Sequence, residues 1–129
     1  MILSESSFWE KAVKDFCEAY DLPPAPPLIV LYDNEQYPTI TGDVEIPTTY
    51  NPVMNRITLS PIVRFSPWLC LHELAHHFQA SAEGYEEYLR KYRESDMVYG
   101  YLNNPYEAAA NEFARVFAPY FENFLKEKP

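Results

Sequence analysis

Hydrophobic residues recur at every third or fourth position near the start of the chain, which is the spacing of one face of an amphipathic helix. That face consists of Trp9, Val13, Phe16 and Tyr20. The pattern predicts a helix that begins at a serine cap, Ser6 or Ser7, and ends near Tyr20. The proline-rich run 21–27 cannot continue this helix, because proline lacks an amide donor and disfavours helix in the residue before it. We interpret this run as a stiff connector in preference to a polyproline ligand for a partner.

Three short runs in the next part of the chain have the composition of β-strands. Residues 28–32 are continuously apolar, which predicts a buried strand followed by a turn at 33–35. Residues 40–46 alternate weakly, as an edge strand does, and residues 56–60 alternate well and are followed by a proline. We therefore expect a small mixed sheet of about three strands.

The second half of the chain has a helical pattern. Ser66 and Pro67 suit the cap and the first position of a helix, and no glycine or proline interrupts residues 68–83. Three tyrosines and a leucine share one face of a short helix expected over 84–93, and we interpret this face as packing. The stretch 95–104 is loop-like, and its apolar content suggests that it walls a cleft.

The last main helix is expected to begin at Asn104, a capping residue that is followed by a proline. Small residues and two polar ones then share one face of it: Glu107, Ala110, Asn111, Ala114 and Ala118. Small side chains let two helices approach closely, so we expect this face to press against the helix over 68–83. Pro119 should kink or end the last helix near Ala118.

The composition narrows the class of protein. With 129 residues, 47% of them hydrophobic, the chain is expected to form a single α+β domain over 1–129. A net charge of −9 without a cluster of basic residues argues against direct nucleic-acid binding. No apolar run is long enough to cross a bilayer, so we expect a cytoplasmic protein with no membrane partner. Cys17 and Cys70 are interpreted as buried apolar residues, not as a disulfide framework.

The residues that carry chemistry lie in the stretch His72-Glu73-Leu74-Ala75-His76. Residues four apart share a helix face, so the two histidines can hold one metal ion between them. Glu73 then lies beside the metal, where a carboxylate can take a proton from an activated water. The alternative is an amphipathic core helix with a solvated Glu73. It is less consistent with two of the three histidines of the chain at this spacing.

A catalytic zinc site typically has three protein ligands, so a third is needed. Ala82 stands where a third histidine would be expected six residues after His76, and His77 points about 100° away from His76 on a helix. The remaining downstream donors are carboxylates: Glu83, Glu86, Glu87, Glu94, Asp96, Glu107 and Glu112.

The position of Glu107 allows two interpretations. If the small-residue face of the last helix packs against the helix over 68–83, Glu107 lies close to the metal. It also follows Asn104 by three residues, which is the spacing of a capping box. Glu86 and Glu83 are the next candidates for the third ligand.

The motif at 72–76, the run 107–114 and Pro119 together resemble the gluzincin pattern of the ImmA/IrrE (minigluzincin-like) metallopeptidases. The resemblance implies a zincin-like fold, in which a sheet packs on the metal helix and a later helix supplies a glutamate. It implies that Glu107 is the third zinc ligand. It also implies that Asn111 supports the first histidine of the motif.

The resemblance covers residues 56–119 and implies cleavage of a peptide bond in a protein or peptide substrate, such as a regulatory protein. Glu73 would pass its proton to the leaving amine, and the strand edge at 40–46 would bind the substrate backbone. Candidate oxyanion donors, each more readily explained by packing, are Tyr99, Tyr101 and Tyr106. A second hypothesis is a catalytically silent zincin-fold regulator that binds a protein partner through its acidic surface. A third is a helical binding module without a metal.

Overall fold

The computed structural model describes residues 5–26, 28–31, 48–59, 63 and 66–126. In chain order the elements are α1 (Glu5–Ala19), β1 (Leu28–Leu31), β2 (Thr49–Asn51), β3 (Arg56–Leu59), α2 (Trp68–Glu83), α3 (Tyr85–Tyr99), the short 3-10 helix η2 (Tyr101–Asn103) and α4 (Pro105–Leu125). The protein is therefore a helix-rich α+β structure with a small sheet, as the sequence predicted.

The sheet has the strand order β1-β3-β2. β3 pairs in parallel with β1, with Ile57 opposite Ile29, and antiparallel with β2, with Ile57 opposite Tyr50. β1 and β3 were predicted within one residue, whereas β2 was not predicted. The expected turn at 33–35 and the expected strand at 40–46 lie outside the described residues.

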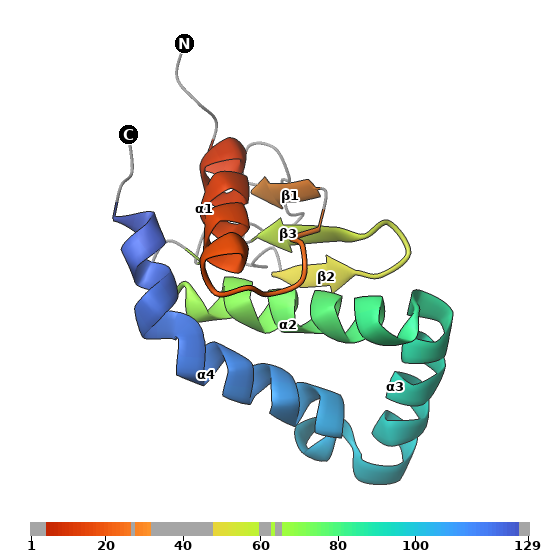
Figure 1. Cartoon of the computed structure of the whole chain (residues 1–129). Helices are drawn as coiled ribbons and strands as arrows, with labels where there is room; N and C mark the ends of the chain where they lie inside the picture. Colours follow the sequence, from red (N-terminus) through yellow and green to blue (C-terminus); the bar gives the residue numbers. More distant parts are fainter. Residues whose placement is uncertain (1–4, 27, 32–47, 60–62, 64–65, 127–129) are drawn as a thin grey trace, which may run out of the picture.

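Helix α2 lies between the sheet and α4, and α1 packs beside the sheet and against the later part of α4 (Figure 1). One hydrophobic cluster joins α1, the sheet, α2 and α4. Its fully buried members include Phe16, Ile29, Ile57, Leu71, Leu74 and Phe121. Because α2 is buried on two sides, the positions of its histidines are fixed by the core of the protein.

Helices α1 and α2 begin close to the expected positions. α1 already includes Glu5, so Ser6 and Ser7 lie inside the helix and do not mark its start. α2 begins at Trp68, and Pro67 occupies the cap position without a side-chain hydrogen bond. Cys17 and Cys70 are both buried and free, as predicted.

Helix α3 is longer than predicted. It continues to Tyr99, so the expected loop is helical over its first five residues. Met97 and Val98 are strongly exposed and do not cover a cleft, whereas Tyr101 of the same stretch does line one. α3 leaves α2 at a sharp corner, where the single residue Gly84 has a φ of 85° (Figure 1). This corner determines where the tyrosines of α3 lie relative to α2.

Helix α4 begins as the sequence predicted. Asn104 is fully buried, and its side chain accepts a hydrogen bond from the backbone N–H of Tyr106. Ala110 and Ala114 are buried, and α4 packs along α2. The helix does not end at Pro119 but continues to Leu125, and its ribbon changes direction towards the C-terminal end (Figure 1). None of the described helices is long and apolar enough to span a membrane.

Candidate metal centre

Two histidines of α2 and a glutamate of α4 bring three donor atoms together. Nε2 of His72 lies 3.2 Å from Nε2 of His76. Oε1 of Glu107 lies 2.9 Å from Nε2 of His72 and 3.2 Å from Nε2 of His76. One helical turn aligns the histidines, and the packing of α4 on α2 places its first turn opposite them. The structure thus brings together all three residues proposed as metal ligands.

This triangle of donor atoms is close to the size that a zinc ion requires. Zinc bonds of about 2.0–2.1 Å in a tetrahedral arrangement separate neighbouring donors by about 3.3 Å. The observed separations of 2.9 to 3.2 Å are only slightly shorter. Two imidazoles and one carboxylate are also a ligand set of catalytic zinc sites, which keep a fourth position for water. The residues present therefore fit such a site.

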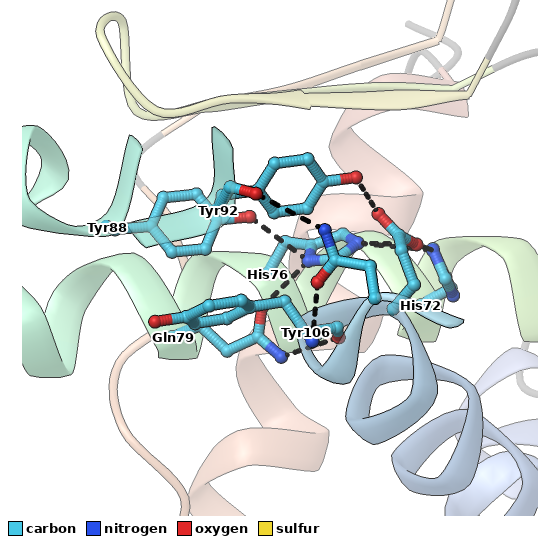
Figure 2. A network of polar contacts seen from close by, with 8 residues as sticks. His72, His76, Gln79, Tyr88, Tyr92 and Tyr106 are labelled. Carbon is cyan, nitrogen blue, oxygen red and sulfur yellow. Dashed lines mark hydrogen bonds and ion pairs between the residues drawn. The ribbon is translucent and has the colours of Figure 1, made fainter. Parts of the chain in front are cut away.

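The outer nitrogen of His76 is held by two neighbours. Its Nδ1 lies 2.8 Å from Oε1 of Gln79 and 3.2 Å from the hydroxyl of Tyr88 (Figure 2). Donation from Nδ1 to Gln79 leaves the lone pair of Nε2 facing His72 and Glu107. Burial lowers the pKa of His76, but hydrogen bonds with Glu107 and Gln79 outweigh it and raise the pKa. These surroundings thus stabilise the positively charged form of the His76 ring.

The outer nitrogen of His72 has a different environment. Its Nδ1 is buried and has no hydrogen-bond partner within the described part of the chain. The ring stacks on Trp68, with centroids 5.1 Å apart and planes inclined by 27°. Asn111 is exposed and does not hold His72 as the resemblance implied. The physical reason is that the buried line of α4 continues from Glu107 to Ala110 and turns Asn111 outwards.

Glu107 uses its two carboxylate oxygens differently. Oε1 faces the histidines, whereas Oε2 accepts a hydrogen bond from the hydroxyl of Tyr92. Burial alone would raise the pKa of Glu107. Hydrogen bonds with His72, His76 and Tyr92 outweigh that effect and hold the pKa well below its usual range. The side chain of Glu107 is therefore a negatively charged carboxylate at neutral pH, as a metal ligand requires.

Glu73 lies beside the donor triangle but is held separately. Its side chain belongs to the same group as the two histidines, with donor atoms within 4.8 Å of one another. It also forms a hydrogen bond with the backbone of Tyr50 in β2, which favours the charged carboxylate. Burial is the largest influence and raises the pKa to about 7, although the histidines oppose it. A carboxylate with this pKa is suited to accept and return a proton near neutral pH.

A cleft of about 240 Å³ opens over these residues. Its walls come from β2, α2, α3, η2 and α4. The lining residues are Thr49, Tyr50, Pro52, His72, Glu73, His76, Tyr88, Leu89, Tyr92, Tyr101 and Glu107. The cleft gives an outside molecule access to Glu73 and to the proposed ligands at once.

Comparisons with known proteins do not identify a relative. No family model matches this chain, and neither does any curated protein or solved structure. The geometry of the site is therefore the main support for assigning a function.

The other residues considered from the sequence have separate roles. Among the carboxylates, Glu83 accepts hydrogen bonds from the hydroxyl of Tyr106, and Glu112 pairs with Arg115. Of the three candidate oxyanion donors, only Tyr101 lines the cleft. His77 points away from the site, as helical geometry predicted.

Several residues of the site were not found from the sequence. They are Gln79, Tyr88, Tyr92 and the backbone of Tyr50. The tyrosines of α3 were recognised as one face of a helix, but nothing in the sequence indicated that their hydroxyls reach His76 and Glu107. The three-residue spacing of His76 and Gln79 on a helix is the local signal that could have indicated their contact.

Proposed function

We propose that this protein is a zinc-dependent metallopeptidase of the gluzincin type, acting in the cytoplasm on a protein or peptide substrate. The convergence of His72, His76 and Glu107 is the observation that carries the proposal. We further propose that the arrangement of sheet, metal helix and glutamate helix is zincin-like and places the protein with the ImmA/IrrE metallopeptidases.

A zinc ion held by these three residues would supply a Lewis acid that activates a water and polarises the scissile carbonyl. Glu73 would accept the proton of the attacking water and deliver it to the leaving nitrogen. The raised pKa of Glu73 supports this role, because a base with a pKa near 7 both gains and releases a proton easily at neutral pH. Its backbone hydrogen bond with Tyr50 fixes the carboxylate beside the donor triangle.

The position of β2 supports a polypeptide substrate. Among the described strands, β2 is at one edge of the sheet, and Thr49 and Tyr50 line the cleft. An extended peptide can bind an edge strand through main-chain hydrogen bonds. A peptide bound in this way would lie across the cleft, with one of its peptide bonds close to Glu73. Residues 40–46, for which the sequence suggested this role, lie outside the described residues.

The proposal is tested by zinc content and by cleavage of a peptide library. We expect one zinc per chain in the wild-type protein and in Glu73→Gln, with turnover only in the wild type. Glu107→Ala should lose zinc, while the matched control Glu112→Ala on the same helix should keep it. Wild-type protein that takes up no zinc would contradict the proposed cofactor. Turnover retained in Glu73→Gln would contradict the proposed base. Zinc binding without cleavage would favour a silent regulator.

A further inference from the structure

The carboxylate of Glu107 is divided between two sets of partners. One oxygen faces both histidines, at 2.9 Å and 3.2 Å. The other oxygen accepts a hydrogen bond from the hydroxyl of Tyr92, which lies on α3 (Figure 2). A carboxylate can bind a metal through one oxygen or through both. The hydroxyl of Tyr92 occupies the second oxygen, and the side chain of Tyr101 in η2 also forms a hydrogen bond with this carboxylate.

Tyr92 is held in this position from several directions. Its ring contacts the rings of Tyr88, Tyr106 and His76, with centroids 5.9 to 6.2 Å apart. Its backbone carbonyl accepts a hydrogen bond of 3.4 Å from the side-chain amide of Asn104.

The same Asn104 fixes the start of the helix that carries Glu107. Its side-chain oxygen accepts a hydrogen bond of 2.9 Å from the backbone N–H of Tyr106, and Asn104 is fully buried. The side chain of Asn104 therefore links the backbone of Tyr92 to the first turn of α4 through two hydrogen bonds. The hydroxyl of Tyr92 and the carboxylate of Glu107 are thus placed relative to each other by the fold, and not only by their own hydrogen bond.

We propose that Tyr92 is a positioning residue that restricts Glu107 to one-oxygen coordination of the metal. The inference rests on the proposed metal site. Two histidines and a single carboxylate oxygen leave the fourth position of a tetrahedral ion for water. A carboxylate bound through both oxygens would raise the number of ligands and crowd that position. A hydrogen bond outside the ligand set is an established means of fixing a ligand in this way.

The test distinguishes the effect of the Tyr92 hydroxyl from the effect of its aromatic ring. Tyr92→Phe removes the hydrogen bond and keeps the aromatic contacts. Two controls remove hydroxyls from the same helix: Tyr88→Phe, whose hydroxyl contacts His76 and not Glu107, and Tyr85→Phe, whose hydroxyl contacts the exposed Glu86. Each protein is loaded with Co²⁺ for visible absorption spectra and with Zn²⁺ in competition with a chromophoric chelator.

We expect the Co²⁺ bands of Tyr92→Phe to weaken, because five-coordinate Co²⁺ absorbs less strongly than four-coordinate Co²⁺. Zinc affinity should fall about 10- to 100-fold, as is typical when a residue that orients a ligand is lost. Tyr88→Phe should keep the intensity of the bands, and Tyr85→Phe should match the wild type in both measurements. An unchanged spectrum in Tyr92→Phe would overturn the proposal, even if its melting temperature fell.

A second measurement needs no variant. X-ray absorption of the zinc-loaded wild-type protein should give four light ligands, with one carboxylate oxygen. A five-ligand shell containing both oxygens of one carboxylate would overturn the role of Tyr92 while leaving the zinc site intact. If the wild-type protein bound neither Co²⁺ nor Zn²⁺, that result would contradict the proposed metal site and therefore also the role of Tyr92.

Discussion

The side-chain amide of Gln79 donates a hydrogen bond of 2.9 Å to the backbone carbonyl of Tyr106. The other end of the same side chain lies 2.8 Å from Nδ1 of His76. One glutamine therefore connects a proposed metal ligand on α2 with the first turn of α4, next to Glu107. The relative position of two proposed ligands depends on this connection.

Replacing Gln79 should weaken metal binding. Gln79→Ala removes both hydrogen bonds, so His76 loses one of the two partners that orient its ring. Zinc affinity is expected to fall about 10- to 100-fold in a competition titration. Gln79→Glu is the matched variant, because it keeps an acceptor for Nδ1 of His76 while it replaces the donor to Tyr106 by a negatively charged oxygen. Its affinity should lie between those of the wild type and Gln79→Ala, and equal affinities in all three proteins would contradict this role.

Glu73 should make the stability of the metal-free protein depend on pH. Burial raises its pKa from 4.5 to about 7, so the folded state keeps a proton that the unfolded state releases. The free energy of unfolding should therefore fall as the pH rises from 4.5 to 7, by about 3 kcal/mol from this residue alone. Glu73→Gln cannot titrate and should not show this loss. The measurement is urea unfolding in the presence of a chelator, and parallel pH profiles for the two proteins would contradict the assignment.

His77 should contribute to stability and not to metal binding. Its Nε2 donates a hydrogen bond of 2.8 Å to the carbonyl of Pro24, and its Nδ1 lies 2.9 Å from Oδ1 of Asn55. The ring is buried, and burial lowers its pKa. His77→Ala removes this packing and leaves buried polar groups without partners, at a cost of about 2–4 kcal/mol in unfolding free energy.

Two variants of α2 make this prediction specific. His77→Phe keeps a ring and should be destabilised less than His77→Ala, whereas the exposed Ser81→Ala should be nearly neutral. Zinc stoichiometry should be unchanged in all of them. A loss of zinc from folded His77→Phe would contradict a purely structural role.

The contact between α2 and α4 should not tolerate a larger side chain. Ala114 is fully buried on the face of α4 that packs on α2. Ala114→Leu would overpack this contact and is expected to reduce the unfolding free energy by about 1–3 kcal/mol. The control is Ala108→Leu, which lies on the exposed side of the same helix. Chemical denaturation measures both, and equal stability of the two variants would contradict the close approach.

Local sequence patterns explain what was predicted correctly. The four-residue spacing of His72 and His76 is a property of one helix, so it needed no knowledge of the fold. The cap at Asn104 likewise depends on adjacent residues. The end of α3 was missed because Met97 and Val98 looked like buried residues of a loop, whereas they are exposed on a helix.

Other features depend on tertiary structure and were not accessible from the sequence. β2 is only three residues long, too short for an alternating pattern to be recognised. Asn111 shares a helical face with Glu107 by spacing, but the direction in which α4 crosses α2 buries Ala110 and exposes Asn111. The hydroxyls of Tyr88 and Tyr92 reach the site only because α3 turns back at Gly84.

That corner at Gly84 makes α3 a lever arm. Tyr92 is eight residues beyond Gly84, a distance of about 12 Å along a helix. A rotation of about 10° at the corner would move its hydroxyl by about 2 Å, enough to break a hydrogen bond. A side chain at Gly84 would meet no neighbouring atom, yet its φ of 85° is strained for other residues. The alignment of the proposed zinc ligands is therefore sensitive to a residue that has no side chain and does not touch them.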